Sequence, residues 1–98
     1  MTTFFATLEV AAGKEAEFEQ LQSELSTLTH EQEPGCFVYD VIRHREKPNT
    51  YAVYARFKDE AAFDEHMAID FHERLVPPIL ACLADGVEMD LQFFDHVA

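Results

Sequence analysis

Histidine is the residue type best suited to chemistry in this chain of 98 residues, which has five histidines and only seven Lys and Arg residues. No two histidines are four residues apart and none form an H-x-H pair, so we expect no metal site. Because imidazole titrates near neutral pH, a histidine can act as a general base that removes a proton from a substrate. His66 is the first candidate for this role. The alternative is a structural histidine that hydrogen-bonds to the sheet or a loop.

His72 is the second candidate base. Six residues separate it from His66, and on a continuous helix this spacing turns the side chains about 120° apart. The two histidines therefore share a face only if the helix breaks between them, which Ile69 and Asp70 would permit.

Aromatic side chains are placed to form an apolar pocket around these histidines. Period-two alternation puts two tyrosines and two phenylalanines of the predicted strands on the face that packs against helices. A phenol there could donate to a substrate carbonyl or simply anchor the core. With one further phenylalanine from a predicted helix, the expected pocket residues are Phe37, Tyr39, Tyr51, Phe57 and Phe63.

Arg56 is a further candidate substrate-binding residue, since a guanidinium could hold a substrate oxyanion or carboxylate. Alternation places it opposite Ala55 and Phe57, however. We favour the interpretation that Arg56 faces the other side of the sheet and pairs with an acid there.

The elements that must position these residues follow from periodicity and turn signals. Alternation or β-branched and aromatic content predicts strands, whereas three- and four-residue apolar spacing predicts helices. Pro77 and Pro78 should end or kink the helix that reaches them. Glutamates 31 and 33, before a turn, are expected to lie in a solvated acidic run. The predicted strands cover residues 4–10, 36–43, 50–58 and 87–97, and the helices cover 14–30, 60–68, 71–76 and 79–83.

The order β-α-β-β-α-β indicates an α+β, ferredoxin-like domain over residues 1–98, with an antiparallel sheet and helices on one face. The other face should be polar if it met water. Its predicted side chains are instead largely apolar, and an uncovered patch of this kind is adhesive. We therefore expect a homodimer that packs sheet against sheet. The apolar positions are Phe5, Val38, Ile42, Ala52, Tyr54 and Phe94.

Composition excludes several partners. Nineteen acidic residues give a net charge of −12, which repels nucleic-acid phosphates and anionic lipid, so we expect no nucleic-acid or membrane partner. Cys36 and Cys82 make no disulfide framework, and they should pack as small apolar side chains. The first residues lack the basic and apolar pattern of a signal peptide, and we expect a cytoplasmic protein.

Four segments in order resemble the antibiotic biosynthesis monooxygenase superfamily: residues 13–18 (GKEAEF), 33–36 (EPGC), 54–59 (YARFKD) and 62–66 (AFDEH). The resemblance implies a dimeric α+β barrel with a pocket between sheet and helices in each protomer. Some members oxygenate anthrones or quinols with O₂ and no cofactor, others degrade haem, and some isomerise small phosphorylated ketones.

This sequence departs from the superfamily pattern at three places. Ala55 stands where a glutamate is usual, and Phe57 where a tryptophan is frequent. The chain has no tryptophan, which argues against haem degradation that relies on one. The second histidine of the pattern falls on Phe71, with His72 one residue later.

The resemblance and the candidate residues together predict a cofactor-independent monooxygenase that oxidises a small aromatic substrate, a quinol or an anthrone, with O₂. His66 and His72 would be catalytic, and no cofactor would be needed. Two alternatives stay open. One is a non-catalytic module that binds a small ligand or assembles with other proteins, and the other is an isomerase that uses the same pocket.

Overall fold

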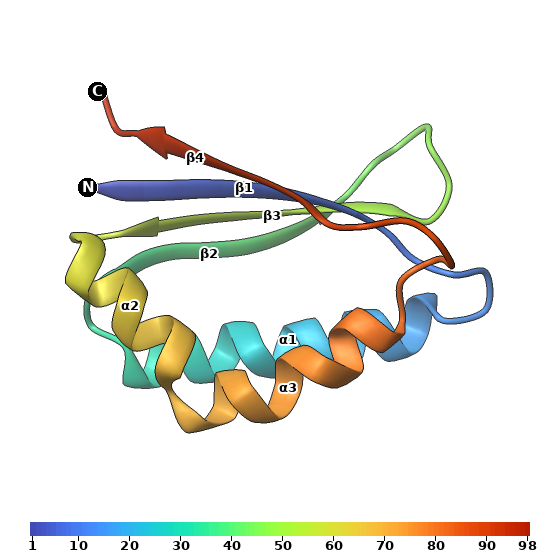
Figure 1. The fold of residues 1–98 in the computed structure, drawn as a ribbon, viewed down its shortest axis with the longest axis horizontal. Helices are drawn as coiled ribbons and strands as arrows, with labels where there is room; N and C mark the ends of the chain where they lie inside the picture. Colours follow the sequence, from blue (N-terminus) through green and yellow to red (C-terminus); the bar gives the residue numbers. More distant parts are fainter.

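The computed structural model describes residues 1–98 as one four-stranded antiparallel sheet with three helices on one of its faces (Figure 1). The strand order is β2-β3-β1-β4. This arrangement confirms the predicted ferredoxin-like α+β fold. None of the helices combines the length and apolar character that crossing a bilayer requires. The elements are β1 (Thr2–Glu9), α1 (Glu15–Gln32), β2 (Cys36–Arg43), β3 (Thr50–Phe57), α2 (Glu60–Ala68), α3 (Asp70–Ala81) and β4 (Asp90–Asp95).

The core lies between the helices and the inner face of the sheet. Alternation along β1 buries Phe4, Ala6 and Leu8, and β3 contributes Val53 and Phe57 to the same layer. Removing this apolar surface from water is the main stabilising contribution to a domain of this size.

Two short helices, rather than one long one, follow β3. The Asp59 side chain caps the N-terminus of α2 by accepting a hydrogen bond from the backbone N–H of Ala62 at 2.8 Å, as an N-cap aspartate is expected to do. Ile69 then adopts an extended backbone, with φ −70° and ψ 146°, between α2 and α3. The chain therefore turns between His66 and His72, where a continuous helix would have separated them.

Pro77 and Pro78 were expected to end or kink the third helix, and the helix does not end there. α3 continues through Pro77 and Pro78 to Ala81. Each proline removes one backbone N–H donor from the helix. The apolar face of α3 still buries Phe71, Leu75 and Ile79 against the core, and this burial offsets the lost hydrogen bonds.

The last strand is shorter than the predicted range 87–97. Only Asp90–Asp95 pairs with β1. Leu91 and Phe93 pair with the inward-facing Ala6 and Phe4, so they lie on the helix side of the sheet. They nevertheless remain 39% and 54% exposed, because the helices do not cover this edge.

A β-bulge changes the expected orientation of side chains at the start of β2. The register with β3 shifts between Cys36 and Val38, so that Cys36 and Tyr39 are both buried although three residues separate them. The extra residue, Phe37, is 48% exposed. The prediction that Phe37 lines the pocket is therefore wrong, because a bulge breaks the two-residue period on which it rested.

Gly35 lies where α2 crosses the start of β2, and a side chain has no room there. A Cβ on Gly35 would lie 2.8 Å from the Cβ of Ala62 in α2. Gly35→Ala should therefore lower the free energy of unfolding by about 1–3 kcal/mol, as overpacking does, measured by urea denaturation. If the clash is the cause, adding Ala62→Gly should recover part of the loss. Equal stability of Gly35→Ala and the parent would contradict this account of the crossing.

Candidate functional site

A cavity of about 120 Å³ lies between the inner face of the sheet and the helices. Most of its lining is apolar, contributed by β1, α1, α3 and the region of β4. Such a composition, apolar with a few polar groups, is typical of small-molecule sites. The polar residues that line it are Gln22, Tyr39, His66 and His72.

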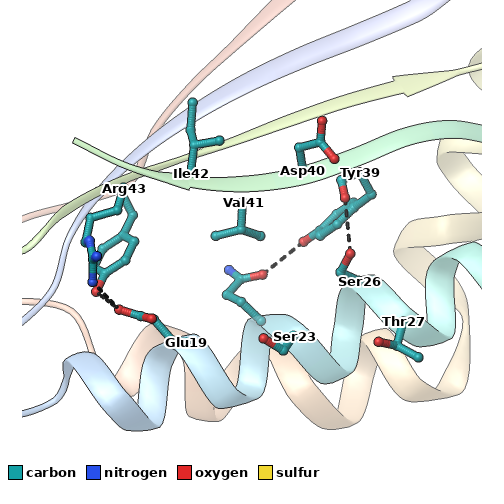
Figure 2. Close-up of a pocket in the computed structure, with 11 residues that line it drawn as sticks. Glu19, Ser23, Ser26, Thr27, Tyr39, Asp40, Val41, Ile42 and Arg43 are labelled. Carbon is teal, nitrogen blue, oxygen red and sulfur yellow. Dashed lines mark hydrogen bonds and ion pairs between the residues drawn. The ribbon is translucent and has the colours of Figure 1, made fainter. Parts of the chain in front are cut away.

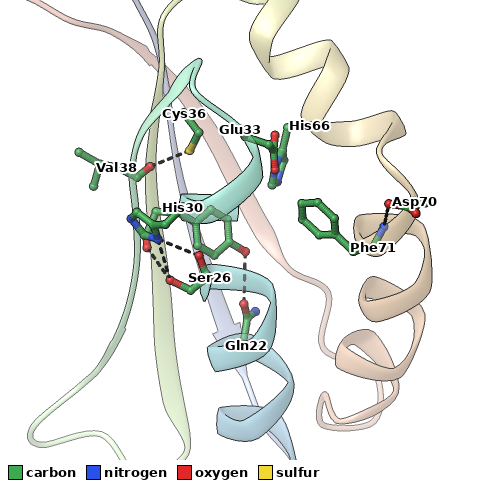
Figure 3. A network of polar contacts seen from close by, with 10 residues as sticks. Gln22, Ser26, His30, Glu33, Cys36, Val38, His66, Asp70 and Phe71 are labelled. Atoms are coloured by element: carbon green, nitrogen blue, oxygen red, sulfur yellow. Dashed lines mark hydrogen bonds and ion pairs between the residues drawn. The ribbon is translucent and has the colours of Figure 1, made fainter. Parts of the chain in front are cut away.

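His66 forms a buried pair with Glu33. The imidazole Nδ1 lies 2.9 Å from Oε2 and 3.1 Å from Oε1 of the Glu33 carboxylate, and Figure 3 shows the two side chains side by side. His66 is 1% exposed and Glu33 is 8% exposed. A carboxylate acceptor places the imidazole proton on Nδ1, and Nε2 is then the basic nitrogen. This arrangement fixes both the orientation and the tautomer of His66.

Aromatic rings surround the His66 imidazole. The ring centroids of Phe57 and Tyr39 lie 5.1 Å and 5.7 Å from it. His72, brought close by the turn at Ile69, packs edge-on at 4.6 Å. Burial, and after it the proximity of His66, lowers the pKa of His72 from 6.5 to about 4. At neutral pH His72 is therefore an uncharged imidazole, and protonation of both rings together is disfavoured.

The lowered pKa of His72 predicts a loss of stability in acid. The unfolded chain, with an ordinary histidine pKa of 6.5, binds the proton more readily than the folded chain does. The free energy of unfolding should therefore fall as the pH drops from about 6.5 to about 4. Urea denaturation across this range should show a smaller loss for His72→Gln and an unchanged loss for His30→Gln, an exposed histidine on α1. Equal losses in the parent and His72→Gln would refute the assignment.

Tyr39 and Gln22 form a second polar pair in the cavity wall. The Tyr39 hydroxyl donates to Oε1 of Gln22, which is labelled in Figure 3, at 3.2 Å. Burial raises the pKa of Tyr39 above its usual range, so the phenol stays protonated. The Tyr39 hydroxyl hydrogen is engaged in the bond to Gln22, whereas the side-chain NH₂ group of Gln22 remains as a donor in the cavity wall.

The predicted site residues fall into two groups. Four of them line the cavity, namely Tyr39, Phe63, His66 and His72. Phe57 packs behind the His66 ring and is fully buried. Arg56 lies on the outer face of the sheet, where its neighbours across the strands are Thr3 and Val38. Arg56 therefore lies on the face that the sequence analysis favoured, because alternation along β3 points it away from the helices, and it is not among the residues that line the cavity.

Tyr51 lines a different hollow, in which Figure 2 labels Glu19 and Arg43. This wider, more open hollow of about 580 Å³ lies between α1 and β2. There the Tyr51 hydroxyl donates to Glu19, which also accepts from the Arg43 guanidinium at 3.3 Å. The predicted place of Tyr51 in the inner pocket is wrong, since its hydroxyl extends past the core to this polar edge. No histidine lines this hollow, so we place the candidate site in the inner cavity.

Two site residues escaped prediction. Glu33 was expected in a solvated run and Gln22 was not singled out, yet both are buried. The spacing carries the signal: the buried positions of α1 and its C-terminal cap are Phe18, Gln22, Leu25, Thr29 and Glu33, separated by three or four residues throughout. A polar residue at such a position is a candidate for a functional role.

No three His, Cys, Asp or Glu side chains are grouped closely enough to hold a metal ion. Burial and the nearby Glu33 raise the pKa of the Cys36 thiol to about 12. Cys36 therefore stays a protonated thiol at neutral pH and is not an activated nucleophile.

Fold and cavity together define a small ferredoxin-like α+β protein whose sheet and helices enclose an apolar, histidine-bearing site. The chain belongs to the antibiotic biosynthesis monooxygenase family, whose model matches residues 1–76. The matched range includes Glu33, His66 and His72. Among curated proteins, none matches the chain in sequence.

Solved structures of similar proteins agree with this assignment. A candidate antibiotic biosynthesis monooxygenase from Caulobacter crescentus CB15 is 25% identical, with a TM-score of 0.92 over 99% of this chain and 90% of that one. Another antibiotic biosynthesis monooxygenase is 28% identical, with a TM-score of 0.89 and full coverage of both chains. SnoaB from Streptomyces nogalater, a cofactor-independent oxygenase, shares the fold at 22% identity, with a TM-score of 0.82 over 97% of this chain and 91% of its own.

Proposed function

We propose that the protein is a cofactor-independent monooxygenase that oxidises a small aromatic substrate, a quinol or an anthrone, with O₂. The observation that carries this proposal is the Glu33–His66 pair, which fixes a histidine in the wall of an apolar cavity. The family assignment and the chemistry of SnoaB point in the same direction.

Each part of the cluster has a role in this chemistry. Nε2 of His66 accepts the proton of a substrate hydroxyl, and the Glu33 carboxylate stabilises the imidazolium that results. His72, uncharged at neutral pH, lines the cavity beside it and does not compete for the proton. The substrate anion is the electron donor to O₂, and the apolar lining keeps bulk water away from it.

The reaction balances without an external reductant. For a hydroquinone, one substrate and one O₂ give one hydroxyquinone and one water. The substrate supplies all four electrons: two in becoming a quinone and two in gaining the hydroxyl group. Uncatalysed autoxidation differs, since one hydroquinone and one O₂ give a quinone and hydrogen peroxide.

Oxygen consumption tests this proposal. We expect protein treated with a chelator to take up O₂ with a hydroquinone or an anthrone above the autoxidation rate, and to form the hydroxylated product without matching peroxide. Peroxide equal to the O₂ consumed would contradict monooxygenation. Substrate binding without O₂ uptake would favour a ligand-binding module, and proton exchange at a substrate carbon without O₂ uptake would favour an isomerase.

We also propose that the protein acts as a homodimer that packs its outer sheet faces together. On this face Ile42 is 52% exposed and Phe94 is 50% exposed in a single chain, and no helix lies over this face of the sheet (Figure 1). An aspartate in the paired face would be buried without a partner. Ile42→Asp should therefore dissociate the dimer in sedimentation velocity, whereas Val87→Asp, outside this face, should not. A monomeric parent protein would refute the dimer.

A further inference from the structure

The lining of the cavity extends from the buried His66 and the partly buried His72 to exposed apolar side chains. His66, at 1% exposure, belongs to the buried part of this lining. Four of the residues that line the same cavity are large, apolar and well exposed, at 38–47%. We call them the mouth residues: Met67 of α2, Leu80 of α3, Met89, which precedes β4, and Leu91 of β4.

The enclosed space suits one ring. An apolar cavity of about 150 Å³ holds a benzene molecule, and the cavity here is about 120 Å³. A fused three-ring system is larger than this space, and an anthrone would have to extend past the mouth residues. A six-membered ring whose hydroxyl faces the histidines would fill it, and any further part of the ligand must leave past the mouth residues.

The side chains at the mouth restrict the chemistry of the part of the ligand that lies across them. No Lys or Arg lines the cavity, so a carboxylate or phosphate on the ligand would find no cation there. The net charge of −12 also disfavours anions. The methionines at the mouth have flexible, polarisable side chains that adapt to apolar chains of different shape.

We infer that the ligand is a single-ring phenol or hydroquinone with an uncharged alkyl tail, its ring beside His66 and His72 and its tail across the mouth residues. The inference rests on the proposed function for the chemistry of the ring, but the geometry of binding can be tested without turnover. The competing occupant of the exposed mouth is a second copy of the chain, and the same experiment distinguishes the two.

Binding of 4-alkylphenols with tails of zero to about eight carbons, measured by calorimetry under anaerobic conditions, tests the inference directly. We expect Kd to fall about two- to fourfold for each methylene that the mouth covers. A phenol with a carboxylate at the end of its tail should bind more weakly than the alkylphenol of equal length. A Kd independent of tail length, or tighter binding of an anthrone than of every alkylphenol, would overturn the inference.

Variants locate the tail. Leu80→Gln and Met89→Gln should each reduce the dependence of Kd on tail length, whereas Val97→Gln, a substitution at a residue 95% exposed and absent from the cavity lining, should leave it unchanged. Sedimentation velocity on the same variants identifies the competing occupant. A changed oligomeric state with unchanged dependence on tail length would make the mouth a protein interface and overturn the inference.

Turnover separates this inference from the proposed function. Alkylhydroquinones that bind with the expected dependence on tail length but consume no O₂ would refute the monooxygenase and leave the ligand assignment standing. Hydroquinones that are oxygenated equally at every tail length would refute the ligand assignment alone.

Discussion

A His66→Gln variant should consume O₂ with an alkylhydroquinone about 10²–10⁴-fold more slowly than the parent, the usual contribution of a general base. Glutamine keeps an N–H donor for the Glu33 carboxylate, so the buried acid is not left without a partner. It offers no basic nitrogen at the position of Nε2. The loss should therefore appear in the rate while the fold is retained, which a thermal melt would confirm.

The rate measurement needs a comparison that separates base chemistry from packing. His72→Gln changes the neighbouring ring, 4.6 Å away, and should lower the rate less than His66→Gln does. A substrate with a more acidic hydroxyl should recover part of the loss in His66→Gln, because it needs less help to ionise. An unchanged rate in His66→Gln would remove this histidine from the mechanism.

Glu33→Ala should lower the free energy of unfolding by about 3 kcal/mol, because it leaves the buried His66 imidazole without its partner. The measurement is urea denaturation of the variant and the parent. Glu31→Ala provides a matched control, since it removes an exposed carboxylate two residues away and should change stability by no more than about 0.5 kcal/mol. Equal losses in the two variants would show that the Glu33–His66 pair does not stabilise the fold.

Glu33 also has a positioning role that stability alone does not report. Glu33→Gln keeps an acceptor for Nδ1 and should recover most of the stability lost in Glu33→Ala. It lacks the charge that stabilises an imidazolium, so its rate should stay well below that of the parent. A Glu33→Gln variant with the parent rate would limit Glu33 to a structural role.

The element order could be predicted from the sequence because strand alternation and helical spacing are local signals. The inward set of β1 and β3 followed directly from alternation. The prediction that Phe37 lines the pocket failed because of the β-bulge. A single extra residue reverses the face of every side chain assigned before it, and it leaves no mark on the local sequence pattern. The expected end of α3 at Pro77 and Pro78 is not observed, because burial of the apolar face of this helix outweighs the local effect of the prolines.

The site could be predicted only in part. His66 was identified by residue type and resemblance, and its closeness to His72 depended on a break that the sequence permitted but did not require. Glu33 escaped because acidic residues beside a turn are usually solvated. What buries it is long-range: α2 packs over the turn between α1 and β2 and brings together two side chains 33 residues apart.

The source of the oxygen atom in the product tests the proposed function most directly. Chelator-treated protein would oxidise an alkylhydroquinone under ¹⁸O₂ in unlabelled water. The product would be reduced at once, to prevent exchange of its quinone oxygens with water, and its mass would then be measured by mass spectrometry. A monooxygenase built on the Glu33–His66 pair should place one ¹⁸O atom in each hydroxylated product, at a rate that falls about 10²–10⁴-fold in His66→Gln. An unlabelled product, with its new oxygen taken from water, would contradict the proposed chemistry.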